Sequence, residues 1–234
     1  DIYFTYQYAL FNKGQDIDWV PGGPQGTPSA DIKAPSAWEE TTGKEDVIIG
    51  ILDTGVDPTH EDLKNKILPG YDFVNDDPDP SDDHRHGTMV AGVVGAETNN
   101  GKGIAGVAWK CKILPVKIMN DSGEGRASQI AAGISWAVEH GAKILNLSFA
   151  APSESLTLET ALKDAFEKQD IFIAAAAGND NTRVYYPAAY EKYVCAAAAT
   201  DYNDERAVYS NFGYEIDVAA PGEKILTTIP TYMT

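Results

Sequence analysis

The sequence has few cysteines and no long hydrophobic run. Only two of its 234 residues are cysteines, Cys111 and Cys195, and two thiols cannot build a disulfide framework. Each lies in an apolar run, which indicates buried structural thiols rather than nucleophiles. No apolar run approaches the roughly 20 residues of a membrane-spanning helix. We therefore expect neither a disulfide scaffold nor a membrane partner.

Basic residues are also scarce. The chain has 18 Lys and Arg against 35 Asp and Glu, and its formal net charge is −17. Such a chain cannot neutralise phosphates, which excludes nucleic acid as a partner. A strong negative field favours solubility and bound cations, although a solvated acidic surface alone would explain most of the charge. Hydrophobic residues at 43% and charged residues at 23% are typical of a globular domain.

The chain is expected to form one domain, because it contains no internal repeat and no low-complexity linker. Residues 1–30 are rich in Gly, Pro and Tyr and predict an extended arm on the surface of a domain spanning 31–234. The first residue is Asp1, with neither Met nor a signal segment. That start favours a processed N-terminus and is compatible with an extracellular, secreted protein.

Beyond the arm, apolar runs alternate with amphipathic segments. We expect strands at 47–53, 111–119, 142–150, 171–177, 193–200, 216–220 and 225–229, and helices at 86–97, 128–141 and 157–169. Ser128 is the expected N-cap of the second helix, and Gly141 lies just past its end. The strands are apolar throughout, which indicates a largely parallel sheet covered on both faces, an α/β three-layer sandwich.

Three polar residues lie at the ends of these predicted strands and helices. Asp53 ends the first strand, His86 opens the first helix and Asn179 follows the strand at 171–177. Taken singly, they could be a turn aspartate, a capping histidine and a Gly-Asn turn. Taken together, at the carboxyl edge of a parallel sheet, they could orient a histidine base and stabilise an oxyanion.

The motifs around these residues are more specific than the residues alone. They read Asp53-Thr-Gly-Val-Asp-Pro-Thr-His, His86-Gly-Thr-Met-Val-Ala-Gly and Ala-Ala-Ala-Gly178-Asn179. In this order they resemble the subtilase family of subtilisin-like serine proteases, and the thermitase-like branch within it. Further matching segments are Ile104–Ala108, Ser122–Gly125, Leu145–Ser148, Tyr209–Phe212 and Val218–Gly222.

The resemblance implies a subtilisin-like fold and a serine endopeptidase with an Asp-His-Ser triad. His86 would take the proton of the serine hydroxyl and return it to the leaving amine, and Asp53 would fix the tautomer of His86. Asn179 would donate to the oxyanion. A protein or peptide substrate would bind as an added β-strand, and a propeptide or a protein inhibitor could accompany the enzyme. The implied substrate-binding residues are Gly123, Glu124, Gly125, Ser148, Phe149 and Ala150, with Ala176 and Gly178 in the wall of the P1 side-chain pocket.

Two departures from the family pattern bear on activity. The family continues to a Gly-Thr-Ser-Met-Ala segment that carries the nucleophile, whereas this chain stops at Thr234, and we expect the nucleophilic serine to be absent from it. Ser148-Phe-Ala-Ala151 replaces the common Ser-Leu-Gly-Gly, and the two added methyl groups would narrow the mouth of the P1 pocket or shift the backbone. The alternative function is therefore a non-catalytic subtilase-like fragment or pseudoenzyme that binds calcium or a peptide.

Calcium is the expected cofactor. An acidic loop presents closely spaced oxygen side chains from Asp72, Asn75, Asp77 and Asp79, which suit Ca²⁺, although a solvated turn is the alternative. The resemblance implies a second site that pins the arm, and a weaker third site is conceivable. The second would use Asp1, Asp62 and Asn100 with the carbonyls of Glu97, Lys102 and Ile104, and the third would lie near Ala188, Tyr190, Tyr193 and Asp217.

Two other patterns are rejected. Gly101-Lys-Gly103-Ile-Ala-Gly106 matches a dinucleotide fingerprint, but here a helix precedes the glycines and a strand follows, which reverses the order that fingerprint needs. His84, close to His86, could suggest zinc, but no second ligand pair supports it.

Overall fold

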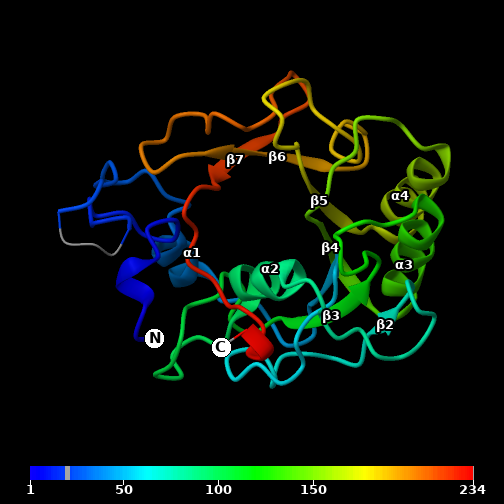
Figure 1. Cartoon of the computed structure of the whole chain (residues 1–234), viewed down its shortest axis with the longest axis horizontal. Coiled ribbons are helices and arrows are strands. Elements are labelled where there is room, and N and C mark those ends of the chain that lie inside the picture. Colours follow the sequence, from blue (N-terminus) through cyan, green and yellow to red (C-terminus); the bar gives the residue numbers. More distant parts are fainter. Residues whose placement is uncertain (19–21, 234) are drawn as a thin grey trace.

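The computed structural model describes residues 1–18 and 22–233 (Figure 1). Its strands are β1 (Ile48–Asp53), β2 (Tyr71–Asp72), β3 (Lys112–Lys117), β4 (Ala142–Leu147), β5 (Phe172–Ala176), β6 (Cys195–Thr200) and β7 (Val218–Pro221). Its α-helices are α1 (Ala34–Glu40), α2 (His86–Gly95), α3 (Ala127–Glu139) and α4 (Leu156–Gln169). Short 3₁₀ turns, η1 (Phe4–Tyr6) and η2 (Thr231–Met233), lie near the two ends.

The strands form one parallel sheet. Within the described residues the strand order is β2-β3-β1-β4-β5-β6-β7, and every neighbouring pair runs in parallel. Continuous apolar runs form these strands because both faces of the sheet are covered. The parallel-sheet prediction is confirmed, and the carboxyl ends of β1, β3, β4 and β5 meet at one edge.

Side chains alternate along β1 between two apolar layers. Ile49 and Ile51 pack with Ala91 of α2 on one face, whereas Leu52 packs with Ile134 of α3 on the other. Helix α4 lies against α3 on that second face (Figure 1). Helices on both sides of the sheet give the three layers expected from the sequence.

The helix boundaries are close to the predicted ones, with one error at α3. This helix begins at Ala127 after Arg126, so Ser128 is not its N-cap, and that prediction is wrong. The Arg126 N–H instead donates to Oε1 of Gln129, which reaches back across the first turn. Gly141 does follow the helix, in a left-handed conformation with φ of 89°, as a C-terminal glycine should.

The predicted strand at 225–229 is also wrong. Its β-branched residues favour a strand, but they run along α2 and make side-chain hydrogen bonds to that helix. Thr227 Oγ1 donates to the carbonyl of Met89, and Thr228 Oγ1 donates to the carbonyl of Thr88. These bonds hold the C-terminal segment against the helix that carries His86. Short α1 and two-residue β2 were not predicted.

The N-terminal arm is partly buried in the domain, whereas the sequence predicted an arm on its surface. Tyr8, Leu10 and Ile17 are buried, and the Tyr8 hydroxyl donates to the carbonyl of Glu223 near the other end of the chain. Cys111 is buried and Cys195 half-buried, and both are free thiols, so the absence of a disulfide agrees with the structure. No helix in the described part of the chain is long and apolar enough to cross a membrane.

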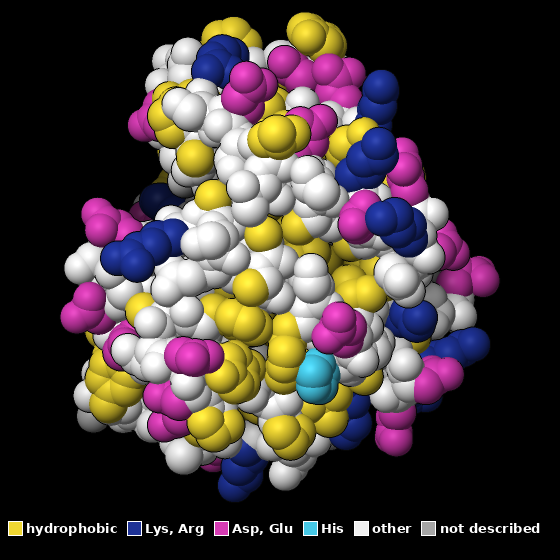
Figure 2. Space-filling view, turned by 90° about the vertical axis from the view of Figure 1, so that its right-hand side faces the viewer, with side chains coloured by type: hydrophobic (Ala, Val, Ile, Leu, Met, Phe, Trp, Pro, Cys, Tyr) yellow, Lys and Arg dark blue, Asp and Glu magenta, His cyan; other side chains and the backbone are white. Residues whose placement is uncertain are grey.

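The outer surface of the α3–α4 layer is charged. Figure 2 shows acidic and basic side chains interspersed with apolar ones on this side of the molecule. Along α4, Lys168 pairs with Asp164 and Lys163 with Glu167, one helical turn apart. The acidic residues therefore lie in part beside compensating lysines on a solvated helix face.

Candidate active site

Asp53 and His86 meet at the carboxyl edge of the sheet. Asp53 is the last residue of β1 and has no exposed surface. Nδ1 of His86, the first residue of α2, lies 2.8 Å from Oδ1 and 3.0 Å from Oδ2 of Asp53. The backbone N–H of Thr54 donates to Oδ1 at 2.7 Å, which holds the carboxylate in place. The His86 side chain keeps 41% of its surface exposed, so its other ring nitrogen can be reached from outside.

The carboxylate changes the acid–base behaviour of the imidazole. The hydrogen bond with Asp53 raises the pKa of His86, burial opposes the rise, and the charges of Asp53 and Asp82 add to it. In the neutral ring, Nδ1–H donates to Asp53 and Nε2 is left as an acceptor. The pair can therefore accept a proton at Nε2 and stabilise the cation that results.

Close packing sets the start of α2 against the end of β1. A Cβ on Gly87 would lie 2.0 Å from the carbonyl oxygen of Gly55, so only glycine fits at this point. Arg85, just before the helix, has φ of 100°, a left-handed conformation that is costly for a residue with a side chain. The approach of His86 to Asp53 thus depends on a glycine contact and on a strained residue.

A cavity of about 540 Å³ opens beside His86. Its polar wall includes Ser148, which follows β4, and Asn179, which follows β5. Its other walls are mostly apolar and come from the arm, from α2 and from the C-terminal segment; they include Leu10, Ile32, Val90, Val93 and Ile225. The structure therefore brings His86, Ser148, Ala176 and Asn179 to one cavity.

The turn that carries Asn179 is held by a residue that sequence reasoning missed as a site residue. Asn211 is fully buried; its Nδ2 donates to the carbonyl of Ala177, and its Oδ1 accepts from the N–H groups of Asp180 and Thr182. Gly178 has φ of 108°, and a Cβ there would lie 2.3 Å from Asn211 Nδ2. Asn211 lies in the matching segment Tyr209–Phe212, but nothing in that segment predicts a contact with the turn of Asn179, which is far from it in the chain.

The predicted substrate-binding segments lie in two places. Ser148, Phe149 and Ala150 follow β4, and Ser148 Oγ accepts from Asn146 Nδ2 at 2.8 Å. Gly123, Glu124 and Gly125 follow β3 in a tight loop, in which the Asn120 N–H donates to the carbonyl of Glu124. His84 lies next to Gly123: a Cβ on that glycine would be 3.5 Å from His84 Nε2. No serine hydroxyl within 1–18 and 22–233 is hydrogen-bonded to His86.

The residues predicted to bind calcium at the arm do gather. The Asp1 carboxylate accepts from the N–H groups of Asn99 and Asn100, and Asn100 Nδ2 donates to Asp62 Oδ1 at 2.6 Å. Asp62 is buried and also accepts from the Ile104 N–H. Nearby, Oε1 of Glu97 is buried with no hydrogen-bond partner. Carboxylate oxygens from two distant segments suit a hard cation. Asn100 directs its Nδ2 to Asp62, and its Oδ1 accepts from the Lys102 N–H, so this amide would have to turn over to bind one.

The acidic loop is arranged differently. Oδ1 of Asp72 accepts from the N–H groups of Val74 and Asn75, and its Oδ2 accepts from Asn75 Nδ2. Asp77 and Asp79 likewise accept from N–H groups two residues ahead. These bonds turn the carboxylates towards their own loop, whereas the Asp1 and Asp62 carboxylates at the arm accept hydrogen bonds from a distant segment of the chain.

The polar residues near the third predicted calcium site also have hydrogen-bond partners within the protein. Asp217 Oδ2 accepts from the N–H of Ala196, and the Tyr190 hydroxyl donates to the carbonyl of Ser155. Across the described residues, no three His, Cys, Asp or Glu side chains are close enough together to hold a metal by themselves. Any calcium at the arm would therefore depend on amide and carbonyl oxygens as well as on carboxylates.

Comparison with known proteins identifies relatives over nearly the whole chain. A family profile described as the subtilase family matches residues 44–234. A thermophilic serine proteinase from a Bacillus species is 44% identical over 232 residues, which cover 95% of this chain and 56% of the relative. Thermitase from Thermoactinomyces vulgaris is 42% identical over 200 residues, which cover 86% of this chain and 71% of the relative. The chain thus spans about half the length of the first of these proteins.

The fold has solved counterparts as well. A protease from Pseudoalteromonas arctica superimposes with a TM-score of 0.82 at 34% identity, over 95% of this chain and 71% of its own. A cold-adapted subtilisin-like serine proteinase gives a TM-score of 0.72 at 30% identity, over 80% of this chain. The α/β sandwich with Asp53, His86 and Asn179 at its sheet edge therefore has the fold of known serine proteases.

Proposed function

The chain belongs to the subtilase family of serine proteases, and from this premise we propose that Asp53 and His86 act in a calcium-stabilised endopeptidase whose nucleophilic serine comes from outside these 234 residues. The resemblance to the thermitase-like branch is confirmed by the relatives, and the subtilisin-like fold by the solved structures. The observation that carries the proposal is the contact of His86 Nδ1 with both oxygens of Asp53.

The roles of the two residues follow from that contact. His86 Nε2 accepts the proton of the serine hydroxyl as the serine oxygen attacks the scissile carbonyl. Asp53 keeps the proton of the neutral ring on Nδ1 and stabilises the imidazolium that forms. The same Nε2–H then protonates the leaving amine, and water repeats the cycle on the acyl-enzyme. Asn179, on the wall of the same cavity, supplies an amide N–H to the oxyanion.

The apolar part of the cavity supports a nucleophile carried on another segment. Val90 and Val93 of α2, with Leu10 and Ile225, present apolar surface beside His86. A segment packed there would bury these side chains and bring a serine hydroxyl to His86 Nε2. Relatives longer than this chain are consistent with such a segment.

The substrate is proposed to bind as a β-strand between the loop at Gly123–Gly125 and the segment at Ser148–Ala150. Ala176 and Gly178, at the end of β5, would form one wall of the P1 pocket. A propeptide or protein inhibitor would occupy the same strand position. An extracellular location remains a prediction.

Calcium is proposed at the arm site. Asp1, Asp62 and Asn100 would bind it with side-chain oxygens, and Glu97, Lys102 and Ile104 with carbonyl oxygens. A bound cation would neutralise two carboxylates that come from distant parts of the chain and so tie the arm to the domain. The acidic loop at Asp72–Asp79 and the group near Asp217 are further proposed sites, and their carboxylates also accept hydrogen bonds.

The proposal is tested with the longest protein that the gene encodes. Cleavage of a fluorogenic peptide should be lost when His86 is replaced by Ala, and the folded variant should still bind the peptide. Binding without cleavage by the unmodified protein would instead favour the non-catalytic alternative. No cleavage and no binding would contradict the proposal.

A further inference from the structure

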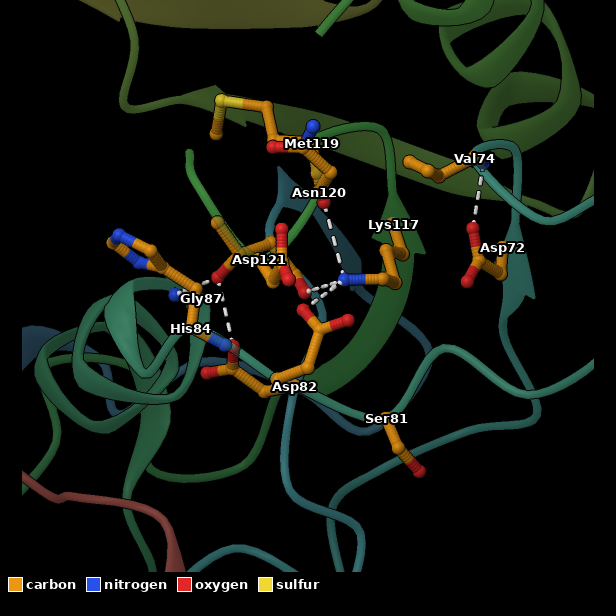
Figure 3. Close-up of polar contacts among 12 residues, drawn as sticks. Asp72, Val74, Ser81, Asp82, His84, Gly87, Lys117, Met119, Asn120 and Asp121 are labelled. Carbon is orange, nitrogen blue, oxygen red and sulfur yellow. Dashed lines mark hydrogen bonds and ion pairs between the residues drawn. The ribbon is translucent and has the colours of Figure 1, made fainter. Parts of the chain in front are cut away.

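A buried carboxylate, Asp82, lies four residues before His86 and makes five hydrogen bonds. Oδ1 accepts from Thr54 Oγ1 at 2.9 Å and from the N–H groups of His84 at 3.0 Å and Arg85 at 2.8 Å. Oδ2 accepts from the N–H of Thr88 at 2.9 Å and from its Oγ1 at 2.6 Å. Asp82 is 5% exposed. Figure 3 shows it beside His84 and Gly87, at the start of α2.

These bonds connect the two proposed catalytic residues through their neighbours. Thr54 follows Asp53 directly, and its hydroxyl also accepts from the Gly87 N–H, next to His86. The Thr88 N–H that donates to Asp82 belongs to the first turn of α2. Asp82 therefore caps the helix that carries His86 and binds the residue next to Asp53 with the same carboxylate.

Asp82 also holds the strained residue before the helix. Arg85 has φ of 100°, and its N–H donates to Asp82. A left-handed conformation at a residue with a side chain persists only when its surroundings fix it. The carboxylate supplies that restraint immediately before His86.

Other charges surround this group. Lys117 is buried, and its ammonium donates to the carbonyl of Met119 at 3.1 Å (Figure 3). It also donates to the carbonyl of Thr54 at 2.7 Å and pairs with Asp83 at 2.5 Å. Arg85 and Tyr232 also lie near Asp82 and Asp83. Around His86, the titratable groups are Asp53, Asp82, the His84 ring at 6.4 Å and Tyr209 on the cavity wall.

We infer that Asp82 is a positioning residue that fixes the geometry of the Asp53–His86 pair, an inference that rests on the proposed roles of that pair. Five donors converge on it, and an asparagine could not accept from all five because its NH₂ group is a donor. Asp82→Asn leaves either the donors of Thr88 or those of Thr54, His84 and Arg85 without an acceptor. The imidazole then loses its fixed approach to Asp53, and the negative charge near it is lost.

The test compares Asp82→Asn with Asp83→Asn. Asp83 is the adjacent residue, carries the same charge and is exposed. It pairs with Lys117 but accepts none of the five hydrogen bonds of Asp82, so it controls for the loss of a nearby negative charge and of the Lys117 contact. NMR titration of His86 needs no turnover and so is independent of whether the protein cleaves peptides. We expect Asp82→Asn to lower the pKa of His86 and to weaken the low-field proton signal of its bond to Asp53, while Asp83→Asn changes neither. In the active protein, kcat should fall at least about tenfold with KM nearly unchanged, as for misplaced catalytic groups.

A second pair of variants covers the case in which Asp82→Asn does not fold. Thr54→Val removes the hydroxyl that joins Asp82 to the neighbour of Asp53, whereas Thr54→Ser keeps it. Valine should reproduce the fall in the pKa of His86, and serine should restore the original value. Equal pKa values in all four variants, or equal shifts from Asp82→Asn and Asp83→Asn, would overturn the inference. If the unmodified protein cleaves no peptide but the variants show the expected changes in the pKa of His86, the result would count against the proposed function. It would not count against the role of Asp82 in holding the pair.

Discussion

Both oxygens of Asp53 lie within 3.0 Å of Nδ1 of His86, so the carboxylate orients the imidazole ring and determines which ring nitrogen carries the proton. Asp53→Asn should keep the fold, because the amide is the same size, but it would favour the wrong tautomer of His86. We expect kcat for a peptide substrate to fall about 10⁴-fold, which is the loss known for the orienting aspartate of another serine protease with the same triad. Circular dichroism checks the fold, and activity within tenfold of the original would refute the role.

Asn179 offers a second prediction for a single residue. Asn179→Ala should lower kcat by about 10²–10³ with little change in KM, which is the loss known for the oxyanion asparagine of subtilisin, a member of the same family. Asp180→Ala, at the next exposed position, is the matched control and should retain activity. Equal effects of the two substitutions would show that the turn, and not the amide, matters.

Residues at strand ends could be predicted from the sequence, because a strand and the turn after it are both local patterns. Asp53 and Asn179 are of this kind. Asn211 and the link from Asp82 to Thr54 could not be predicted, since their hydrogen-bond partners lie far away in the sequence and only the folded chain brings them near. Ser128 was wrongly predicted as an N-cap for a local reason: the helix begins one residue earlier, and Gln129 accepts from the Arg126 N–H.

Among the elements, the C-terminal segment depends on one buried aspartate. Asp57 Oδ2 accepts from the N–H and Oγ1 of Thr231, and its Oδ1 accepts from Thr59. Burial opposes ionisation, but these hydrogen bonds prevail and lower the pKa of Asp57 to about 2 from its ordinary 3.8. The ionised form is therefore the one that holds this segment, which also lines the cavity beside His86.

The sign of the pH dependence follows from this lowered pKa. The stability that Asp57 contributes is fully present above its ordinary pKa of 3.8 and is lost as the pH falls through about 2. At about 1.4 kcal/mol per unit, the contribution is on the order of 2 kcal/mol. Asp57→Asn should lower the free energy of unfolding at pH 5, and the difference from the original protein should shrink at pH 2. Asp46→Asn, at an exposed site, is the control, and a difference that stays constant with pH would contradict this account.

Element types were predictable where hydrophobic runs were continuous, as in β1 and β3. The run at 225–229 has the same composition, but its hydroxyls bind carbonyls of α2, so the segment follows a helix instead of joining the sheet. Composition cannot distinguish these two outcomes, because the same β-branched residues can form a sheet strand or an extended segment beside a helix. Helix α1, with seven residues, is too short for its periodicity to be recognised.

At the scale of the whole molecule, the N-terminal arm contacts the domain at Asn99 and Asn100 through Asp1, and it contacts Glu223, near the other end of the chain, through Tyr8. Calcium at Asp1, Asp62 and Asn100 should therefore raise the melting temperature. With the ion at 100 times its Kd, the added free energy of unfolding is about 2.7 kcal/mol. Calorimetry with calcium and with a chelator measures the effect. Asp62→Asn should abolish most of it, whereas Asp77→Asn in the acidic loop should leave most of it intact. Identical melting temperatures with calcium and with chelator would contradict binding at the arm.

The parallel architecture could be read from alternating apolar and amphipathic segments, because helices α2, α3 and α4 each lie between two successive strands of the sheet. The strand order β2-β3-β1-β4 could not be predicted, since the sequence does not show which strands lie next to each other in the sheet. That order places β1 between β3 and β4 and brings Asp53 between the two proposed substrate-binding segments. The cavity beside His86 is likewise a property of the folded chain.

Labelling with a fluorophosphonate, followed by mass spectrometry, tests the central claim most directly. The longest protein that the gene encodes is labelled, digested and mapped, alongside its His86→Ala variant. We predict that one serine outside residues 1–234 carries the label and that the variant is not labelled. Label on Ser148, label that persists without His86, or a protein that cleaves peptides without reacting would contradict the account.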